Sequence, residues 1–333
     1  MPQTSRRIFV TDCEGPVTKN DNAAELAEAF MPQGSAFFRK ISLYDDYLAE
    51  ISHKQGYKAG DTLKLILPFL KAFGVDDRTI QKFSRRSIEM IPFADTVLKQ
   101  IQDIAPAYIV STSYSPYIEA VCDVIGFPVQ FTFSTQMNLD NFILSESEKK
   151  FIKTAHSRII DLPDVTIDES VNSVSDMSAP DMEVIGQLDA LFWDQLPQLD
   201  IYALLESVNP IGGREKAEAI WEIVRKEGAD LENVLYIGDS ITDVEAFRLV
   251  RTGGGLAVSF NGNHWAVREA SIALTARNAN PIGWIAQAFI AHGMESLEDL
   301  MIQKVTPENE SVLSEHSSQI RKTVRTEKIG ALG

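Results

Sequence analysis

Two acidic residues near the start of the chain, Asp12 and Glu14, follow a short apolar run at positions 8–10. Gly15 comes next, and a glycine lets the chain turn sharply and lets a ligand approach the backbone. Open α/β sheets bind ligands at the carboxyl ends of their strands, where this turn is expected to lie. One carboxylate could attack a substrate or bind a metal, and the other could transfer a proton.

Polar residues follow two later apolar runs in the same way. Ser111 and Thr112 come after the run at 107–110, and Asp239 comes after the run at 234–237. If all three runs are parallel strands, their carboxyl ends meet at one edge of the sheet. We therefore expect these side chains to lie close to Asp12.

Two more residues complete the candidate site. Asp243 is four residues beyond Asp239, where it could support a metal directly or through water, and Lys216 lies in the first turn of an expected helix. A hard divalent cation such as Mg²⁺ would neutralise Asp12 and Asp239. Lys216 and the Ser111 hydroxyl could bind the oxygens of an anion, and Lys216 would also keep Asp12 ionised.

These residue types together describe a phosphoryl-transfer site, which works by positioning and charge neutralisation. Asp12 would attack phosphorus to form an aspartyl-phosphate. Glu14 would protonate the leaving oxygen and then activate water. Ser111, Thr112 and Lys216 are the expected phosphate-binding residues.

The elements that must position these residues alternate along the chain. Predicted strands occupy residues 8–10, 107–110, 234–237, 256–260 and 272–275. Helical periodicity occurs at residues 118–124, 215–225, 244–249 and 281–289. Short apolar runs bounded by turn residues suit parallel strands that helices cover on both faces. The pattern predicts an α/β fold with a Rossmann-like parallel sheet core.

The predicted core is interrupted, because the gap between Asp12 and Ser111 is far longer than one crossover helix needs. Periodic segments at residues 18–91 predict an inserted, mainly helical cap. We assign residues 1–17, 92–130 and 205–300 to the core.

Two further segments lie outside this core. Residues 131–204 are rich in Asp and Glu. They could form a second lid or an oligomerisation arm, and a solvated insertion is the alternative. The tail at residues 305–333 is polar and mixed in charge, which predicts one exposed helix or partial disorder.

The composition limits the partners. The formal net charge of −16, from 31 basic and 47 acidic residues, argues against nucleic acid or an anionic membrane as the main partner. Only two cysteines, Cys13 and Cys122, are present, which favours a reducing compartment. With no recognisable signal peptide and no apolar run near the ~18 residues of a membrane span, we expect a cytoplasmic protein.

Four motifs in this order resemble those of the haloacid dehalogenase (HAD) superfamily of phosphohydrolases. They are DxDG as Asp12-Cys13-Glu14-Gly15, the serine motif as Ser111-Thr112-Ser113, the lysine as Lys216, and GDxxxD as Gly238-Asp239-Ser240-Ile241-Thr242-Asp243. The approach to Ser111 and the large helical insertion look like those of phosphoserine-phosphatase-like members. The resemblance covers roughly residues 5–130 and 205–290.

The resemblance implies hydrolysis of a small phosphorylated metabolite. It implies that Mg²⁺ is bound by Asp12, Asp239 and the backbone carbonyl of Glu14, with Asp243 in support. The acidic insertion and the overall layout also resemble archaeal proteins described as subunit R of energy-converting hydrogenase A.

One departure from the pattern leaves the function open, because Glu14 stands where the phosphatases of this superfamily have aspartate. A catalytic group misplaced by about 1 Å can lower a rate roughly 10²-fold. The alternatives are a phosphotransferase or mutase, or a catalytically weak scaffold that serves as a subunit or regulator of a larger complex. Association as a homo-oligomer also stays open.

Overall fold

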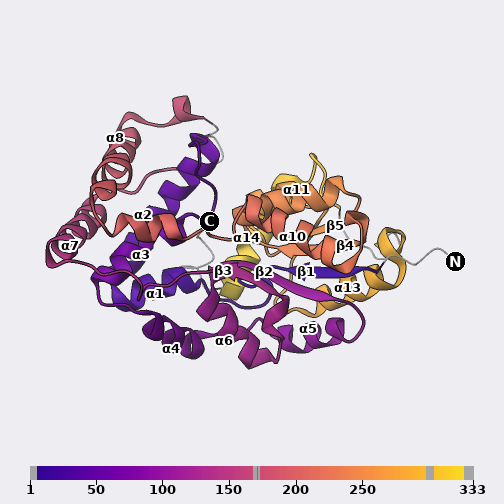
Figure 1. Cartoon of the computed structure of the whole chain (residues 1–333). Helices are drawn as coiled ribbons and strands as arrows, with labels where there is room; N and C mark the ends of the chain where they lie inside the picture. Colours follow the sequence, from indigo (N-terminus) through magenta and orange to yellow (C-terminus); the bar gives the residue numbers. More distant parts are fainter. Residues whose placement is uncertain (1–5, 168–170, 172, 298–303, 326–333) are drawn as a thin grey trace.

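A parallel six-stranded sheet forms the centre of the structure, a computed structural model that describes residues 6–167, 171, 173–297 and 304–325 (Figure 1). The strands are β1 (Ile8–Thr11), β2 (Ala107–Tyr114), β3 (Thr132–Thr135), β4 (Val234–Gly238), β5 (Leu256–Phe260) and β6 (Ile272–Leu274). They lie in the order β3-β2-β1-β4-β5-β6, and each neighbouring pair is parallel. The predicted α/β fold with a Rossmann-like parallel sheet is confirmed.

The strand order fixes where a ligand can bind. The chain adds β2 and β3 on one side of β1 and then returns to place β4 on the other side. In open α/β sheets, ligands bind at such a reversal, beyond the carboxyl ends of the strands. Asp12 follows β1 and Asp239 follows β4, so both residues lie at this crevice.

Helices cover both faces of the sheet. On one face, α5 (Ala94–Gln102), α6 (Ser115–Ile125) and α13 (Asn280–His292) share a hydrophobic cluster with Phe9 of β1. On the other face, α10 (Arg214–Glu227) and α11 (Val244–Thr252) pack with Ile8 and Val10. Alternate residues of a strand point to opposite faces, and both faces are covered here, so the runs are apolar at every position.

Two strands differ from the sequence-based expectation. β2 continues to Tyr114, so Ser111 lies inside the strand, where the pairing with β3 becomes irregular. β3 falls in the segment 131–204 that was assigned to an insertion, so the sheet extends past residue 130. β3 is an edge strand whose Phe133 is only partly buried, and it therefore lacks the continuous apolar run that marks the other strands.

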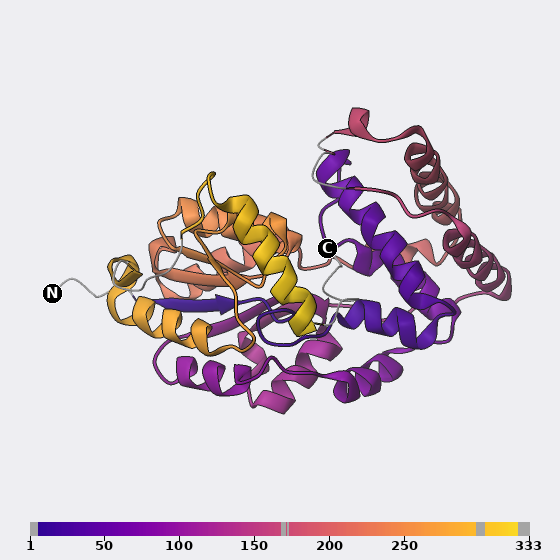
Figure 2. The same cartoon turned by 180° about the vertical axis from the view of Figure 1, so that it is seen from behind.

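A helical layer projects beyond one end of the sheet (Figures 1 and 2). The first insertion supplies α1 (Asn22–Phe30), α2 (Gly34–Asp46), α3 (Thr62–Ala72) and α4 (Asp77–Ser87), and the second supplies α7 (Glu146–Asp161), α8 (Ala179–Asp189) and α9 (Tyr202–Ser207). Residues of both insertions, including Phe37, Phe69, Ile152 and Phe192, belong to one hydrophobic cluster. The two insertions therefore share one hydrophobic core, and we call the two insertions together the cap.

Short helical turns connect these elements. They are π-helical at Tyr47–Ile51 and Ala190–Gln195, and 3₁₀-helical at Val129–Phe131, Val174–Asp176, Leu196–Gln198, Leu231–Asn233, Ile241–Asp243 and Gly293–Leu297. Within the described residues, no helix combines the length and apolar character needed to cross a bilayer.

The tail forms α14 (Glu310–Arg325), which packs against α12 (His264–Glu269) and runs toward the crevice (Figure 2). The sequence predicted an exposed helix or disorder. The helix is present, but Leu313, Ser317, Arg321 and Arg325 are buried. Their spacing of four residues places them on one face of the helix. Because three of the four are polar, the pattern resembles that of a solvated helix.

A histidine lies inside the cap core. His156 is 1% exposed, and its ring centroid is 4.9 Å from that of Phe37 and 4.8 Å from that of Phe73. Its Nε2 atom has no hydrogen-bond partner among the described residues. Burial lowers the pKa of His156 from 6.5 to about 4. Folding therefore favours the neutral ring.

We predict that His156 makes the protein sensitive to acid. Its folded-state pKa lies below its unfolded value, so its contribution to stability is complete above pH 6.5 and is lost as the pH falls toward 4. Between pH 7 and pH 5 the wild type should lose about 2 kcal/mol more unfolding free energy than His156→Leu. Urea unfolding at both pH values measures this, with the exposed His292→Leu as control. Equal losses in all three proteins would contradict the prediction.

Candidate active site

A buried lysine connects two of the acidic residues. Lys216 lies in the first turn of α10, and its side chain is 0% exposed. Its Nζ atom is 2.6 Å from Oδ2 of Asp12 and 2.7 Å from Oδ1 of Asp243. Burial by itself would lower the pKa of Lys216, but the two carboxylates raise it above its usual range. The lysine is therefore a fixed positive charge beneath the crevice.

Asp243 holds this lysine in place. Its Oδ1 also accepts a hydrogen bond of 2.5 Å from the Tyr236 hydroxyl. Its Oδ2 accepts from the backbone N–H groups of Asp239, at 2.9 Å, and Ser240, at 3.0 Å. Burial opposes ionisation, but Lys216 and these hydrogen bonds keep the pKa of Asp243 below its usual value. The Ser240 hydroxyl also donates to Oδ2 at 3.4 Å, so Oδ1 has two donors and Oδ2 has three.

Asp12 is held at the carboxyl end of β1 by its backbone and side-chain contacts. Its backbone N–H donates to the Ile237 carbonyl at 2.8 Å, which fixes it beside β4. Oδ1 accepts from the N–H of Cys13 at 2.6 Å, while Oδ2 accepts from Lys216. Burial raises the pKa of Asp12 to about 7, Asp243 and Asp239 add to this effect, and Lys216 opposes it. Lys216 is the group that favours the ionised carboxylate.

Three carboxylates are close enough together to hold one metal ion. Oxygens of Asp12, Asp239 and Asp243 all lie within 4.8 Å of one another, and all three residues are buried. Oxygen ligands of this kind suit a hard divalent cation such as Mg²⁺. The chain after Glu14 passes so near this cluster that a Cβ atom on Gly15, which has φ of 101°, would lie 2.1 Å from Oδ2 of Asp239. The donor set and the backbone path both fit a cation here.

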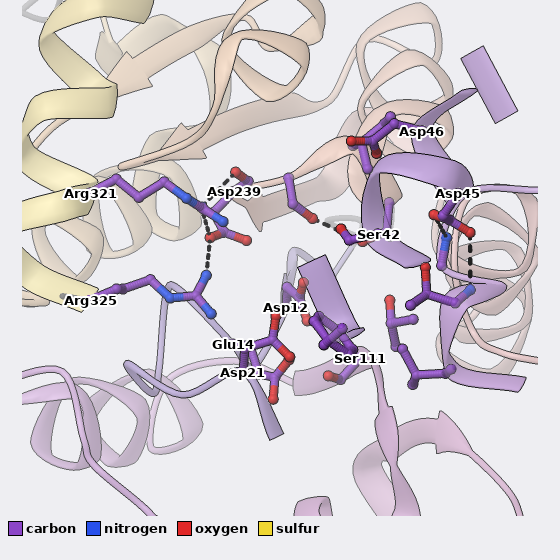
Figure 3. Close-up of a pocket in the computed structure, with 18 residues that line it drawn as sticks. Asp12, Glu14, Asp21, Ser42, Asp45, Asp46, Ser111, Asp239, Arg321 and Arg325 are labelled. Atoms are coloured by element: carbon purple, nitrogen blue, oxygen red, sulfur yellow. Dashed lines mark hydrogen bonds and ion pairs between the residues drawn. The ribbon is translucent and has the colours of Figure 1, made fainter. Parts of the chain in front are cut away.

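Glu14 lies in the same cavity (Figure 3). Its Oε1 accepts a hydrogen bond of 2.7 Å from the N–H of Asn22, at the start of α1. Burial, together with nearby Asp21, raises the pKa of Glu14 well above its usual value, although Arg325 opposes the shift. The side chain is therefore suited to carry a proton.

Ser111 and Thr112 supply hydroxyl groups at the cavity wall. Ser111 is 0% exposed, and its hydroxyl lies 3.2 Å from that of Ser113. The Oγ1 atom of Thr112 is buried and has no hydrogen-bond partner among the described residues. A buried hydroxyl without a partner is costly. An oxygen of a bound anion would satisfy it.

The cap lines one side of the cavity, whose volume is about 110 Å³. Asp45 of α2 accepts hydrogen bonds from the N–H groups of Gly60, at 3.1 Å, and Thr62, at 3.0 Å. This holds Gly60, with φ of 91°, against the floor of the site, where a Cβ atom would lie 2.9 Å from Thr112. The cap residues that line the cavity are Phe38, Ser42, Asp45, Asp46, Gly60, Thr62 and Leu63.

Two site residues were not predicted from the sequence. Arg321 and Arg325 of α14 line the cavity, and both contact Oδ2 of Asp239 (Figure 3). Arg321 Nη1 also donates to the Asp239 carbonyl at 3.0 Å, and Arg325 Nη1 lies 2.9 Å from Oδ2. The sequence feature that could have indicated this buried helix face is the spacing of four residues between Leu313, Ser317, Arg321 and Arg325.

The residues singled out in the sequence therefore lie together. Those lining the cavity are Asp12, Glu14, Ser111, Thr112 and Asp239, and Lys216 and Asp243 lie beneath it. Their catalytic, phosphate-binding and metal-binding roles stay predictions.

The whole chain matches a known structure. Gene product AF1437 from Archaeoglobus fulgidus superposes with a TM-score of 0.85 and 28% sequence identity over 98% of this chain and 99% of that chain. An apo phosphoserine phosphatase superposes with a TM-score of 0.50 and 14% identity over 83% of this chain and 97% of that chain. The chain has the haloacid dehalogenase-like fold. No protein-family model matches the sequence, and no curated protein matches it significantly.

In this HAD-like fold, the sheet of the present chain brings all the expected site residues to one crevice. At 14% identity, the phosphoserine phosphatase bears on the fold alone. The chemistry must therefore be argued from the side chains described above.

We predict that Lys216→Met strongly destabilises the protein. The substitution leaves two buried carboxylates without their cation, and removing one partner of a buried ion pair costs about 3–5 kcal/mol. Arg214→Gln on the same helix is the control, because Arg214 pairs with Glu218 at the surface. Urea unfolding should show a large loss for Lys216→Met and little change for Arg214→Gln. Similar losses would show that the buried pair has no special role.

Proposed function

We propose that the protein is a Mg²⁺-dependent phosphomonoester hydrolase that acts through an aspartyl-phosphate. The observation that carries this proposal is the 2.6 Å contact between Lys216 Nζ and Asp12 Oδ2 at the floor of the cavity. A buried carboxylate beside a fixed cation, two further acids and the buried Thr112 hydroxyl without a partner suit phosphoryl transfer better than a structural role.

In the first step, a carboxylate oxygen of Asp12 would form a bond to phosphorus while the ester P–O bond breaks. The electron pair of that bond leaves on the alcohol oxygen, and Glu14 donates the proton that this oxygen takes up. Ser111, Thr112 and Lys216 would bind and orient the phosphoryl group. Mg²⁺, held by Asp12, Asp239 and the backbone carbonyl of Glu14, would neutralise part of its charge.

In the second step, water would attack the phosphorus of the aspartyl-phosphate. The deprotonated Glu14 takes a proton from this water, the bond from phosphorus to Asp12 breaks, and inorganic phosphate leaves. Asp12 and the protonated Glu14 are regenerated. The raised pKa of Glu14 supports its role, because a general acid must carry a proton at the working pH.

The cavity favours a small substrate. Its volume of about 110 Å³ suits a phosphoryl group with a small alcohol portion, which the cap residues would contact. The cap residues above the site would have to move for entry and release, as lids do in many enzymes. Closure would exclude bulk water while the phosphoryl group is transferred.

The decisive test measures phosphate release from a panel of small phosphomonoesters with Mg²⁺, using the wild type and Asp12→Asn. The substitution removes the nucleophile and keeps the shape of the side chain, so activity should fall to background. A mass increase from a trapped phosphoryl group should be seen only in the wild type. An active Asp12→Asn protein, or a wild type inactive on every ester, would refute the proposal.

A second prediction concerns Glu14. Glu14→Gln keeps an oxygen for the Asn22 hydrogen bond but cannot donate a proton to the leaving alcohol, so kcat/KM for alkyl phosphates, which reports on the first step alone, should fall by about 10²-fold or more. The loss should be much smaller for p-nitrophenyl phosphate, whose leaving group needs no proton. Equal losses for both kinds of ester would show that Glu14 is not the general acid. Glu14→Asp should also change kcat, because it moves the carboxyl group.

One observation favours a second candidate function, a scaffold with weak catalysis that serves a larger complex. Arg321 and Arg325 both pair with Oδ2 of Asp239, and the proposed cation would need this oxygen as a ligand. If they stay in place permanently, the site would bind phosphate without efficient turnover. The resemblance to subunit R of energy-converting hydrogenase A belongs with this candidate.

A further inference from the structure

The helix α14 brings two positive charges to the carboxylate at the end of β4. Arg321 and Arg325 are 3% and 4% exposed, and each contacts Oδ2 of Asp239. Asp239 itself is 1% exposed. These are buried, charge-assisted contacts, which are stronger than ion pairs at a surface.

Other contacts hold α14 in this position. The Ser317 hydroxyl donates to the Gly262 carbonyl at 2.7 Å, in the loop after β5. Arg325 Nε donates to the Lys19 carbonyl at 3.0 Å, and its Nη2 donates to the Asn20 carbonyl. The helix therefore joins the loops that follow β1 and β5, on both sides of the crevice.

The arginines balance the charge of the site without a metal. The cluster of Asp12, Asp239 and Asp243 carries three negative charges, and Lys216, Arg321 and Arg325 carry three positive charges, so the sum is zero. Buried charges need such compensation. A divalent cation would add two positive charges to these six groups, and only the other acids that line the cavity, Glu14, Asp21, Asp45 and Asp46, could offset them.

The contacts of Asp239 also oppose a bound cation. A cation bound to Oδ2 of Asp239 would use the oxygen to which both guanidinium groups donate. It would also lie close to those groups, and like charges a few ångströms apart repel strongly in a buried site. Oδ2 of Asp239 can therefore serve the arginines or a cation, but not both.

We propose that α14 is an intramolecular latch on the metal site, so that docking of Arg321 and Arg325 on Asp239 competes with binding of a divalent cation. This inference rests on the metal site of the proposed function. The two binding events are linked, so the factor by which docked arginines weaken cation binding equals the factor by which the cation weakens docking.

The first test measures the affinity of the full-length protein for Mg²⁺ by isothermal titration calorimetry. Arg321→Gln/Arg325→Gln removes both competing charges, and Mg²⁺ should bind about tenfold more tightly than to the wild type. Lys322→Gln is the matched control, because it removes a positive charge from an exposed position of the same helix and should leave the affinity unchanged. Unchanged or weaker binding by the double variant overturns the latch.

A milder variant covers the case in which the double variant does not fold. Ser317→Ala removes only the anchor to Gly262, so it should loosen α14 and tighten Mg²⁺ binding by up to about fivefold, the equivalent of one hydrogen bond. Unchanged or weaker Mg²⁺ binding by this folded variant overturns the proposal.

The second test uses hydrogen exchange on the wild type. If α14 is a latch, saturating Mg²⁺ should speed hydrogen exchange of the backbone amides at 310–325. If Mg²⁺ binds and these rates stay the same, the proposed competition is wrong.

The outcomes separate the two proposals. If all variants bind Mg²⁺ with equal affinity and the protein is an active phosphatase, the latch is wrong and the proposed function stands. If neither the wild type nor the double variant binds Mg²⁺, the metal-dependent function and the latch both fail.

Discussion

The ammonium group of Lys216, enclosed between Asp12 and Asp243, is the interaction on which the site depends. Removing three charges from water is costly, and their mutual attraction repays that cost only when the geometry is good and the remaining lone pairs have donors. The Tyr236 hydroxyl and two backbone N–H groups provide those donors for Asp243. Consequently β1, β4 and α10 have little freedom to move relative to one another at this point.

The same electrostatic requirement explains why α14 belongs to the site. Lys216 contacts two acids, and Asp239 remains at the end of β4 with its own charge. Arg321 and Arg325 supply the missing compensation from a helix outside the alternating βα pattern. The cap adds Asp45 and Asp46, so acids outnumber basic residues among the side chains that line the cavity.

Much of this arrangement could be predicted from the sequence. The apolar runs of β1, β2 and β4 are unambiguous because helices cover both faces of the sheet, and each run leads to a polar site residue. The strand β3 escaped prediction because an edge strand with partly buried side chains has no such run. The site role of α14 was not predicted because the sequence alone does not distinguish a buried arginine that pairs with an acid from an arginine exposed to solvent.

The contact of Arg325 with Lys19 joins residues 306 positions apart. During synthesis on the ribosome, the core strands and all the acids of the crevice emerge long before α14 does. A nascent chain would therefore pass through a period in which Asp239 has neither arginine and is open to any cation in the surroundings. Proteins that depend on contacts between residues far apart in the sequence also fold more slowly in general. In that period, an early-bound metal ion would delay the docking of the last helix.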